Sequence, residues 1–122
     1  MADSFTDHRG TIEDLLITPL DGVTRIETRA QAVRGNHTHV ASHQWAYVVS
    51  GRLLVVTEEN GFRKRHEYGP GEISHEPPGV PHAWRALEDT VCLVFTRGPR
   101  TGDYESDTQR LTVPLIDPEA RT

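Results

Sequence analysis

Cysteine, methionine and long apolar stretches are nearly absent from this chain, and each absence excludes a class of protein. The 122 residues include one cysteine and one methionine, so a fold held together by internal disulfides is excluded. No stretch approaches the roughly 18 consecutive apolar residues of a membrane-spanning helix. No segment repeats its apolar residues with the period of about 3.6 that marks an amphipathic helix, so no long helix is expected.

The chain also lacks an excess of positive charge. Its formal net charge is −5, which argues against general nucleic-acid binding. Residues 1–10 contain no apolar core of the kind found in secretory signals. Cys92 lies in an apolar run and is predicted to be a reduced, buried packing residue. We therefore expect a cytoplasmic protein whose partners include neither nucleic acid nor a membrane.

Short runs of β-branched and aromatic residues, separated by glycine and proline, fill most of the chain. Such runs predict an all-β sandwich or barrel with about nine short strands. Asn60-Gly61 favours the two-residue type I′ turn of a hairpin. The predicted strands are Thr11–Ile17, Val23–Thr28, Gln44–Ser50, Arg52–Glu58, Phe62–Tyr68, Glu72–Glu76, His82–Leu87, Val91–Thr96 and Leu111–Leu115.

Three histidines carry the strongest chemical signal. His37 and His39 are two residues apart, which places both on the same face of a β-strand. His82 follows the turn residues Pro77-Pro78-Gly79 and can reach the same point from another strand. Converging neutral imidazoles suit a divalent metal, and they also suit proton transfer near neutral pH. Burying three imidazoles without partners would cost several kcal/mol, so a functional site is the simpler interpretation.

These motifs match a known family. Gly35-x-His37-x-His39-x4-Gln44-x6-Gly51 resembles the first signature of the cupin superfamily, and Gly71-x5-Pro77-x-Gly79-x2-His82 resembles the second. The resemblance implies one domain over residues 1–122, folded as a single antiparallel jelly-roll barrel with the site inside. It also implies a divalent transition metal, Ni, Zn, Fe or Mn, whose ligands are His37, His39, Gln44 and His82.

Gln44 departs from the family pattern, which usually has glutamate at that position. A neutral amide oxygen is a weaker ligand for a divalent cation than a carboxylate. Two alternatives therefore stay open: a metal that is held, and a site without one. His43 is an alternative ligand, although its parity on the strand is opposite to that of Gln44, so we expect it to point away.

The chain also resembles the small cupins that act on deoxy-sugar nucleotides, namely the 3,4-ketoisomerases and, more distantly, the 3,5-epimerases. This resemblance implies that Arg34, and with it Arg9, holds a diphosphate, and that His37 and His39 move a proton between sugar carbons without a metal. The matching residues are Asp7-His8-Arg9-Gly10, Arg34-Gly35-Asn36-His37-Thr38-His39, Gln44, Ser50-Gly51 and Val91–Phe95.

Two further residues are candidates for substrate contact. His75 precedes Pro77 on a strand expected to line the barrel, where it would act as a substrate-facing base together with His37. Arg100 lies in a polar loop that could cover the mouth of the barrel. We expect an enzyme of isomerase, lyase or dioxygenase type that acts on a small polar or sugar-like substrate, or else a non-catalytic ligand-binding protein. Aromatic residues beside the motifs, if exposed, would favour a homodimer.

Overall fold

The computed structural model describes residues 4–99 and 104–120. Within these two ranges, eleven strands and one short helix follow one another. They are β1 (Ser4–Asp7), β2 (Gly10–Glu13), β3 (Gly22–Thr28), β4 (Val33–His39), β5 (His43–Ser50), β6 (Leu53–Glu59), β7 (Phe62–Tyr68), β8 (Ile73–Glu76), β9 (His82–Ala86), β10 (Thr90–Arg97), α1 (Tyr104–Asp107) and β11 (Thr108–Arg110).

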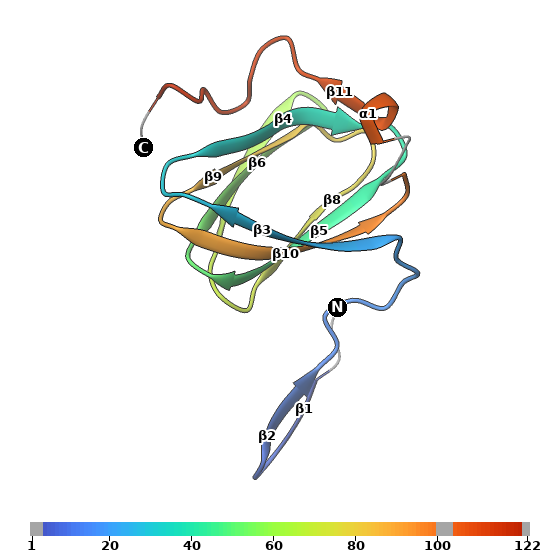
Figure 1. The fold of residues 1–122 in the computed structure, drawn as a ribbon, viewed down its shortest axis with the longest axis vertical. Coiled ribbons are helices and arrows are strands. Elements are labelled where there is room, and N and C mark those ends of the chain that lie inside the picture. Colours follow the sequence, from blue (N-terminus) through green and yellow to red (C-terminus); the bar gives the residue numbers. More distant parts are fainter. Residues whose placement is uncertain (1–3, 100–103, 121–122) are drawn as a thin grey trace.

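Two antiparallel sheets face each other and form a jelly-roll barrel (Figure 1). One sheet has the strand order β3-β10-β5-β8, and the other has the order β11-β4-β9-β6-β7. The predicted all-β class is confirmed, and the described residues contain no long helix, as predicted. Among residues 4–99 and 104–120, no helix has the length and apolar character needed to cross a bilayer.

The alternation of residues along the strands fills the barrel interior. In β5 and β10 every second side chain is buried and its neighbour is more exposed, as expected for strands with one face on a core. Cys92 is 3% exposed and lies in this core, which confirms its prediction as a buried packing residue. The main core cluster consists of Ala46, Val48, Leu53, Val55, Trp84, Cys92 and Val94.

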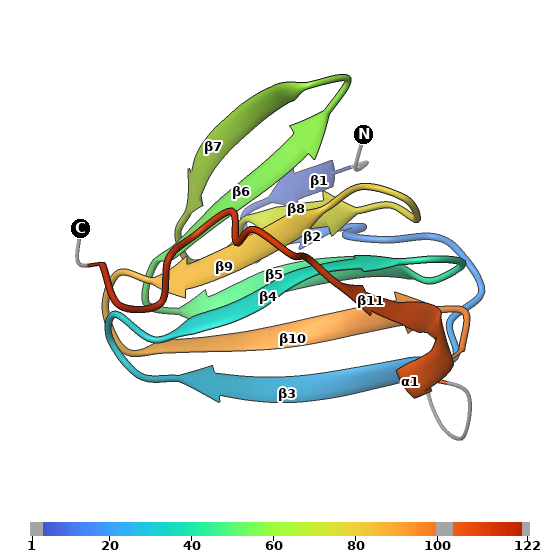
Figure 2. The ribbon, with the colours of Figure 1, turned by 90° about the horizontal axis from the view of Figure 1, so that it is seen from above.

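A second apolar layer lies on the outer face of the five-stranded sheet. Leu54, Val56 and Ala83 point outward from β6 and β9 and pack against Ile116. The segment that follows β11 crosses this face (Figure 2). Since one face of β6 lines the barrel and the other lies under this segment, four consecutive residues, 53–56, are buried.

Several strand boundaries differ from the sequence prediction. The strand predicted over Leu111–Leu115 is wrong, because the chain there forms no strand and instead bonds to Asn36. The strand predicted over Thr11–Ile17 ends at Glu13, where its pairing with β1 ends, and β1 itself was not predicted. The hairpin at Asn60-Gly61 is confirmed by φ values of 52° and 79°, which are those of a type I′ turn.

A buried carboxyl group lies on the inner face of β8. Glu76 is fully buried and accepts hydrogen bonds from the Trp84 indole Nε1 at 2.7 Å and from the Ser74 hydroxyl at 3.0 Å. Burial raises the pKa of Glu76 to about 7, although the two hydrogen bonds lower it. Between the pKa of Glu76 in the unfolded chain and its higher pKa in the folded protein, the folded protein therefore holds a proton that the unfolded chain has released.

We expect Glu76→Gln to change the pH dependence of stability. The raised pKa means that the contribution of Glu76 to wild-type stability is fully present in acid and is lost as the pH rises through about 7. The amide carries no charge at any pH. The free energy of unfolding of the variant, relative to that of wild type, should therefore rise by roughly 3 kcal/mol between about pH 4 and pH 8. Urea unfolding at several pH values measures this gain. Glu59→Gln, at an exposed position, is the control. If the free energies of unfolding of wild type and Glu76→Gln changed with pH in parallel, the raised pKa of Glu76 would be contradicted.

Candidate active site

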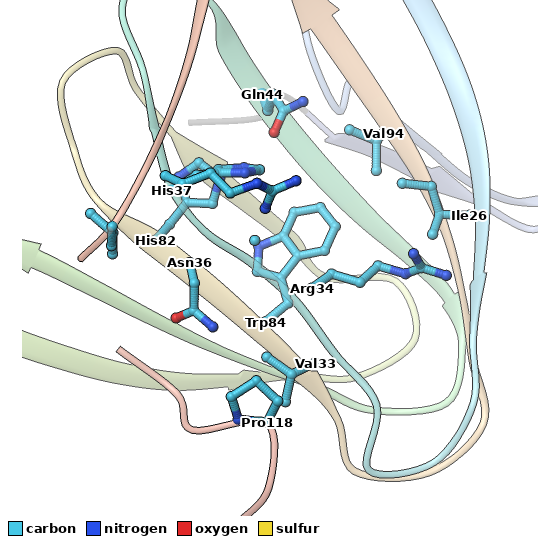
Figure 3. A pocket seen from close by; sticks show the side chains of 13 residues that line it. Ile26, Val33, Arg34, Asn36, His37, Gln44, His82, Trp84, Val94 and Pro118 are labelled. Atoms are coloured by element: carbon cyan, nitrogen blue, oxygen red, sulfur yellow. The ribbon is translucent and has the colours of Figure 1, made fainter. Parts of the chain in front are cut away.

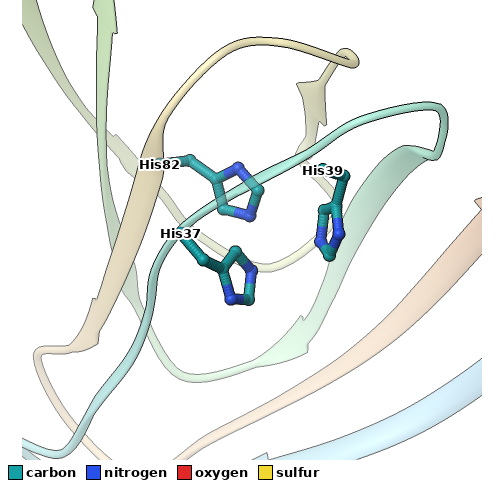
Figure 4. A group of neighbouring side chains, drawn as sticks. All are labelled: His37, His39 and His82. Carbon is teal, nitrogen blue, oxygen red and sulfur yellow. The ribbon is translucent and has the colours of Figure 1, made fainter. Parts of the chain in front are cut away.

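Three histidines meet inside the barrel (Figure 4). His37 and His39 come from β4, and His82 is the first residue of β9. A ring nitrogen from each lies within 4.8 Å of a nitrogen from each of the other two. The ring centroid of His37 lies 4.5 Å from that of His39 and 4.7 Å from that of His82. The structure thus brings together the three histidines that the sequence singled out.

A β-bulge in β4 sets the orientation of this cluster. Gly35 pairs with Ala83 while His37 pairs with His82, so Asn36 is an extra residue in β4. Gly35 and Asn36 have φ values of 90° and 58°, in the left-handed region that glycine and asparagine tolerate best. A Cβ atom at Gly35 would lie 3.1 Å from the carbonyl oxygen of His82, so glycine also permits the close approach of β4 and β9.

The bulge also brings Arg34 to the site. Strict alternation would place Arg34 and His37, three residues apart, on opposite faces of β4. The extra residue restores the phase, so Arg34 lies opposite Trp84 and both line the same cavity as His37. The Arg34 guanidinium donates to the Thr28 hydroxyl and to the carbonyl oxygen of Glu27, each at 2.9 Å.

Burial holds the imidazoles of His37 and His82 in the neutral form. Burial lowers the pKa of His37 to about 4, and the neighbouring charges of His39 and Arg110 lower it further. Burial likewise lowers the pKa of His82 to about 3, with additional effects of His37 and His39. Both rings therefore present lone pairs at neutral pH, which metal coordination requires.

Hydrogen bonds set which nitrogens face the cluster. His82 Nδ1 lies 3.2 Å from the carbonyl oxygen of Val80; a carbonyl can only accept, so Nδ1 carries the proton and Nε2 carries the lone pair. His39 Nδ1 lies 3.6 Å from Asp107 Oδ2 and 3.4 Å from the Thr108 hydroxyl. His37 Nδ1 is buried and has no hydrogen-bond partner within the described residues.

Asp107 is itself fixed in place beside His39. Its Oδ1 accepts a hydrogen bond from the Ala41 backbone N–H at 2.8 Å. Burial alone would raise the pKa of Asp107, but hydrogen bonds from Ser42 and Ala41 and the proximity of His39 leave it lowered. A carboxylate behind a histidine orients the ring and makes its other nitrogen a better ligand.

A cavity of about 540 Å³ lies next to the histidines. Gln44, His37 and Trp84 face it from three different strands (Figure 3). Gln44 is 8% exposed, so its amide lies inside the barrel as its parity on the strand requires. The described lining residues are Ile26, Val33, Arg34, Gly35, Asn36, His37, Gln44, His82, Trp84, Val94, Arg110, Leu111 and Pro118.

Two candidates lie elsewhere. His75 is on the outer face of the four-stranded sheet, because its neighbours Ser74 and Glu76 point inward. The prediction that His75 belongs to the barrel site is therefore wrong. His43 also points outward, as expected; its Nδ1 lies 3.1 Å from His75 Nε2, and the two rings and Trp45 are stacked.

The two remaining arginine candidates do not add to the described site. Arg9 lies in the β1–β2 turn, where it forms an ion pair with Asp7 at 2.7 Å, and this hairpin extends away from the barrel (Figure 1). Arg100 lies outside the described residues.

Sequence reasoning missed three residues of the site. Trp84 lies two residues after His82, so strand alternation could have placed both on the inner face. Asp107 and Arg110 carry no such signal, because their positions depend on the pairing of the short β11 with β4, where Arg110 lies opposite His37.

Residues 16–119 match the model of the cupin family. The chain belongs to the cupin family. Two curated relatives are oxalate decarboxylases: OxdC of Bacillus subtilis, 30% identical over 91 residues, and one from Arthroderma benhamiae, 27% identical over 99 residues. The alignments cover 72% and 75% of this cupin but 23% of each relative, so the chain spans about a quarter of their length.

Solved structures agree with the cupin fold. A sugar 3,4-ketoisomerase from Thermoanaerobacterium thermosaccharolyticum in complex with TDP superposes with a TM-score of 0.73 at 18% identity, covering 91% of this chain and 85% of that one. A dTDP-4-dehydrorhamnose 3,5-epimerase from Sulfolobus tokodaii superposes with a TM-score of 0.69 at 21% identity, covering 93% and 76%. At these identities the similarity concerns the fold.

We expect Asn36→Ala to destabilise this cupin by roughly 2–3 kcal/mol. The Asn36 amide donates to the carbonyl oxygen of Ile116 at 2.9 Å and accepts from the backbone N–H groups of Leu115 and Ile116, and alanine tolerates its positive φ poorly. Asn36→Gly is the matched control, since it accepts the backbone conformation but lacks the amide. Urea unfolding measures both, and a loss below about 0.5 kcal/mol in the alanine variant would show that the bulge does not depend on this side chain.

Proposed function

We propose that this cupin is a small-molecule enzyme with a divalent metal inside its barrel. The observation that carries the proposal is the cluster of His37, His39 and His82, whose ligand atoms lie within 4.8 Å of one another. The substrate class is small and polar or sugar-like, in keeping with a cavity of about 540 Å³ beside the cluster.

The chemistry of the donor set fits a transition metal. Three neutral imidazole nitrogens suit Ni, Zn, Fe and Mn, and the Gln44 oxygen would be a weak fourth ligand. His37 Nδ1, which has no hydrogen-bond partner among the described residues, and the lone pair left on His82 Nε2 are the kind of buried atoms that a metal would satisfy. When bound, such a metal supplies Lewis-acid or dioxygen-activating chemistry at the positions its protein ligands leave open.

The residues around the cluster have separate roles in this proposal. Arg34 is held by Thr28 and the backbone of Glu27, so it would bind a polar group of the substrate without first losing conformational freedom. Trp84 forms a flat apolar wall whose orientation is fixed by its hydrogen bond to Glu76. His37, the most accessible of the three histidines, would orient the substrate or move its proton.

A second candidate is a metal-independent nucleotide-sugar ketoisomerase. It is favoured by the neutral Gln44, by the position of Arg34 in the cavity, and by structural neighbours that are sugar 3,4-ketoisomerases. In this alternative the same neutral histidines act as acid and base, and Arg34 binds a phosphate group.

Substitution of His37 and His82 separates the two candidates. If the function depends on a metal, His37→Ala and His82→Ala should each remove it, because each deletes one of three nitrogen ligands. If the histidines act alone, His37→Ala should abolish turnover of a nucleotide sugar while His82→Ala does less. Elemental analysis of protein purified without a metal column gives the metal content. Less than about a tenth of an equivalent, with no uptake on titration, would exclude the metal candidate.

The pH dependence of metal content is a further check on that experiment. Since the folded pKa values of His37 and His82 are lowered to about 4 and about 3, protons compete for these nitrogens only in strong acid. The metal should therefore stay bound down to about pH 5 and leave below it. His75→Ala and His43→Ala, on the outer face of the sheet, are the matched controls and should keep the metal.

We propose that the protein is a homodimer, joined through the outer face of its four-stranded sheet. An aromatic and apolar row crosses this face: Val23 lies opposite Phe95, and Phe95 lies opposite Trp45. Val23 is 57% exposed. The β1–β2 hairpin carries a second exposed pair, since Phe5 lies opposite Ile12. Two apolar surfaces on one chain suit a symmetric, self-complementary contact.

Light scattering tests the dimer. We expect wild type to have twice the chain mass of 13.7 kDa, and Val23→Asp to shift the protein to monomer, because it buries a charge in the contact. Val113→Asp, at a position 68% exposed on the C-terminal segment, is the control. A wild type that is monomeric at micromolar concentration would overturn the proposal.

A further inference from the structure

The cavity beside the histidines has positively charged walls. Of the described residues that line it, Arg34 and Arg110 carry a charge at neutral pH and none is acidic. The buried carboxyl of Glu76 is not among the described lining residues, and one of its oxygens accepts a hydrogen bond from the indole N–H of Trp84. No carboxylate among the described lining residues balances the two guanidinium groups.

Some described arginines of the protein form ion pairs with carboxylates, whereas Arg29, Arg65, Arg85 and Arg97 form none within the described residues. Arg9, Arg25, Arg52 and Arg63 each form an ion pair with an aspartate or glutamate. In the part of the chain that the structure describes, no such pair is formed by Arg34 or Arg110. The partners of Arg34 are a neutral hydroxyl and a carbonyl oxygen, which fix its guanidinium but leave its charge uncompensated.

Arg110 lies next to the histidine cluster. It is the last residue of β11, and its backbone lies opposite that of His37, so the two side chains point to the same face of the sheet. Its charge acts on His37, since it is one of the causes that lower the pKa of that ring. Arg34 and Arg110 are both exposed residues near His37, the first three residues before it on β4 and the second opposite it on the neighbouring strand.

We propose that this cavity binds a substrate with at least two negative charges, held between Arg34 and Arg110. Guanidinium groups bind carboxylates and phosphates through paired hydrogen bonds. Two such groups without carboxylate partners match a dianion, either a small dicarboxylate or the diphosphate of a nucleotide. Arg110 is then a binding residue that sets the specificity of the site. The inference names the substrate class of the same cavity and so rests on the proposed function.

Isothermal titration of metal-free protein tests the charge requirement. Protein dialysed against a chelator is titrated with malonate, thymidine diphosphate, acetate and the uncharged malonamide, so that no ligand binds through a metal. We expect at least one dianion to bind once per chain and at least about tenfold more tightly than acetate, with no measurable binding of malonamide. Binding of malonate alone identifies a dicarboxylate, and binding of thymidine diphosphate alone identifies a nucleoside diphosphate. Equal affinities for the charged and uncharged ligands would overturn the proposal.

Variants assign the binding to the two arginines. Arg110→Gln and Arg34→Gln should each weaken the dianion at least about tenfold and weaken acetate less. Arg65→Gln on β7, at an exposed position, is the control and should bind as wild type does. Arg110→Lys keeps the charge without the paired hydrogen bonds and should be intermediate, which covers the case in which the glutamine variant folds poorly. Unchanged dianion affinity in both Arg110 variants would overturn the role of Arg110.

The same measurements separate this inference from the proposed function. Dianion binding that depends on Arg34 and Arg110, in a protein that takes up no metal, would support the inference and exclude the metal enzyme. Stoichiometric metal in a protein that binds neither dianion would support the metal enzyme and overturn the inference of a dianionic substrate.

Discussion

The site depends on one irregularity in one strand. A regular β4 would send Arg34 and His37 to opposite faces, and Arg34 would then point away from the cavity. The extra residue Asn36 corrects the phase, and its side chain at the same time binds the backbone at Leu115 and Ile116. The bulge therefore orients the arginine and anchors the segment that covers the outer face of the five-stranded sheet.

The barrel interior is divided between an apolar part and a polar part, and Trp84 lies between them. On one side, Leu53, Val48 and Cys92 pack as a conventional core. On the other, three imidazoles gather, with His39 and His82 buried and His37 half-buried. Desolvation lowers the pKa values of His37 and His82. Burying neutral rings costs less than burying charged ones, so the fold tolerates the cluster at neutral pH. Acid opposes this arrangement because the rings would have to take up protons inside the barrel.

Much of the fold and part of the site follow from local sequence. Strand alternation places His37 and His39 together, and the Asn60-Gly61 turn fixes a hairpin, because both depend on neighbouring residues. The prediction for His75 was wrong because the Pro-Pro-Gly turn separates β8 from His82. The alternation of inner and outer side chains on one strand therefore does not predict the alternation on the other. The inward position of Arg34 depends on a bulge that residue types alone do not locate.

The site residues that come from distant parts of the sequence could not be predicted for a different reason. Asp107 and Arg110 reach the histidines because the three-residue β11 pairs with the edge of β4. Thr108 and His39, which face each other in this pairing, are 69 residues apart in the sequence. Such a short strand has no periodicity to recognise, and its own predicted neighbour, Leu111–Leu115, forms no strand. The pairing rests on tertiary contacts, which override local preference in short strands.

The position of the interior carboxylate connects the two proposals. Gln44 is neutral where cupins usually carry glutamate, and the barrel instead has Glu76 opposite Gln44 on β8, where the indole and hydroxyl of Trp84 and Ser74 occupy it. A divalent cation held by three neutral imidazoles would thus have no protein carboxylate among the proposed ligands, and two guanidinium groups would stand beside it. In that case, a dianionic substrate would supply the missing negative charge. By thermodynamic reciprocity, a substrate that strengthens metal binding is itself bound more tightly when the metal is present. Metal affinity and substrate affinity would then both depend on the net charge of the groups inside the barrel.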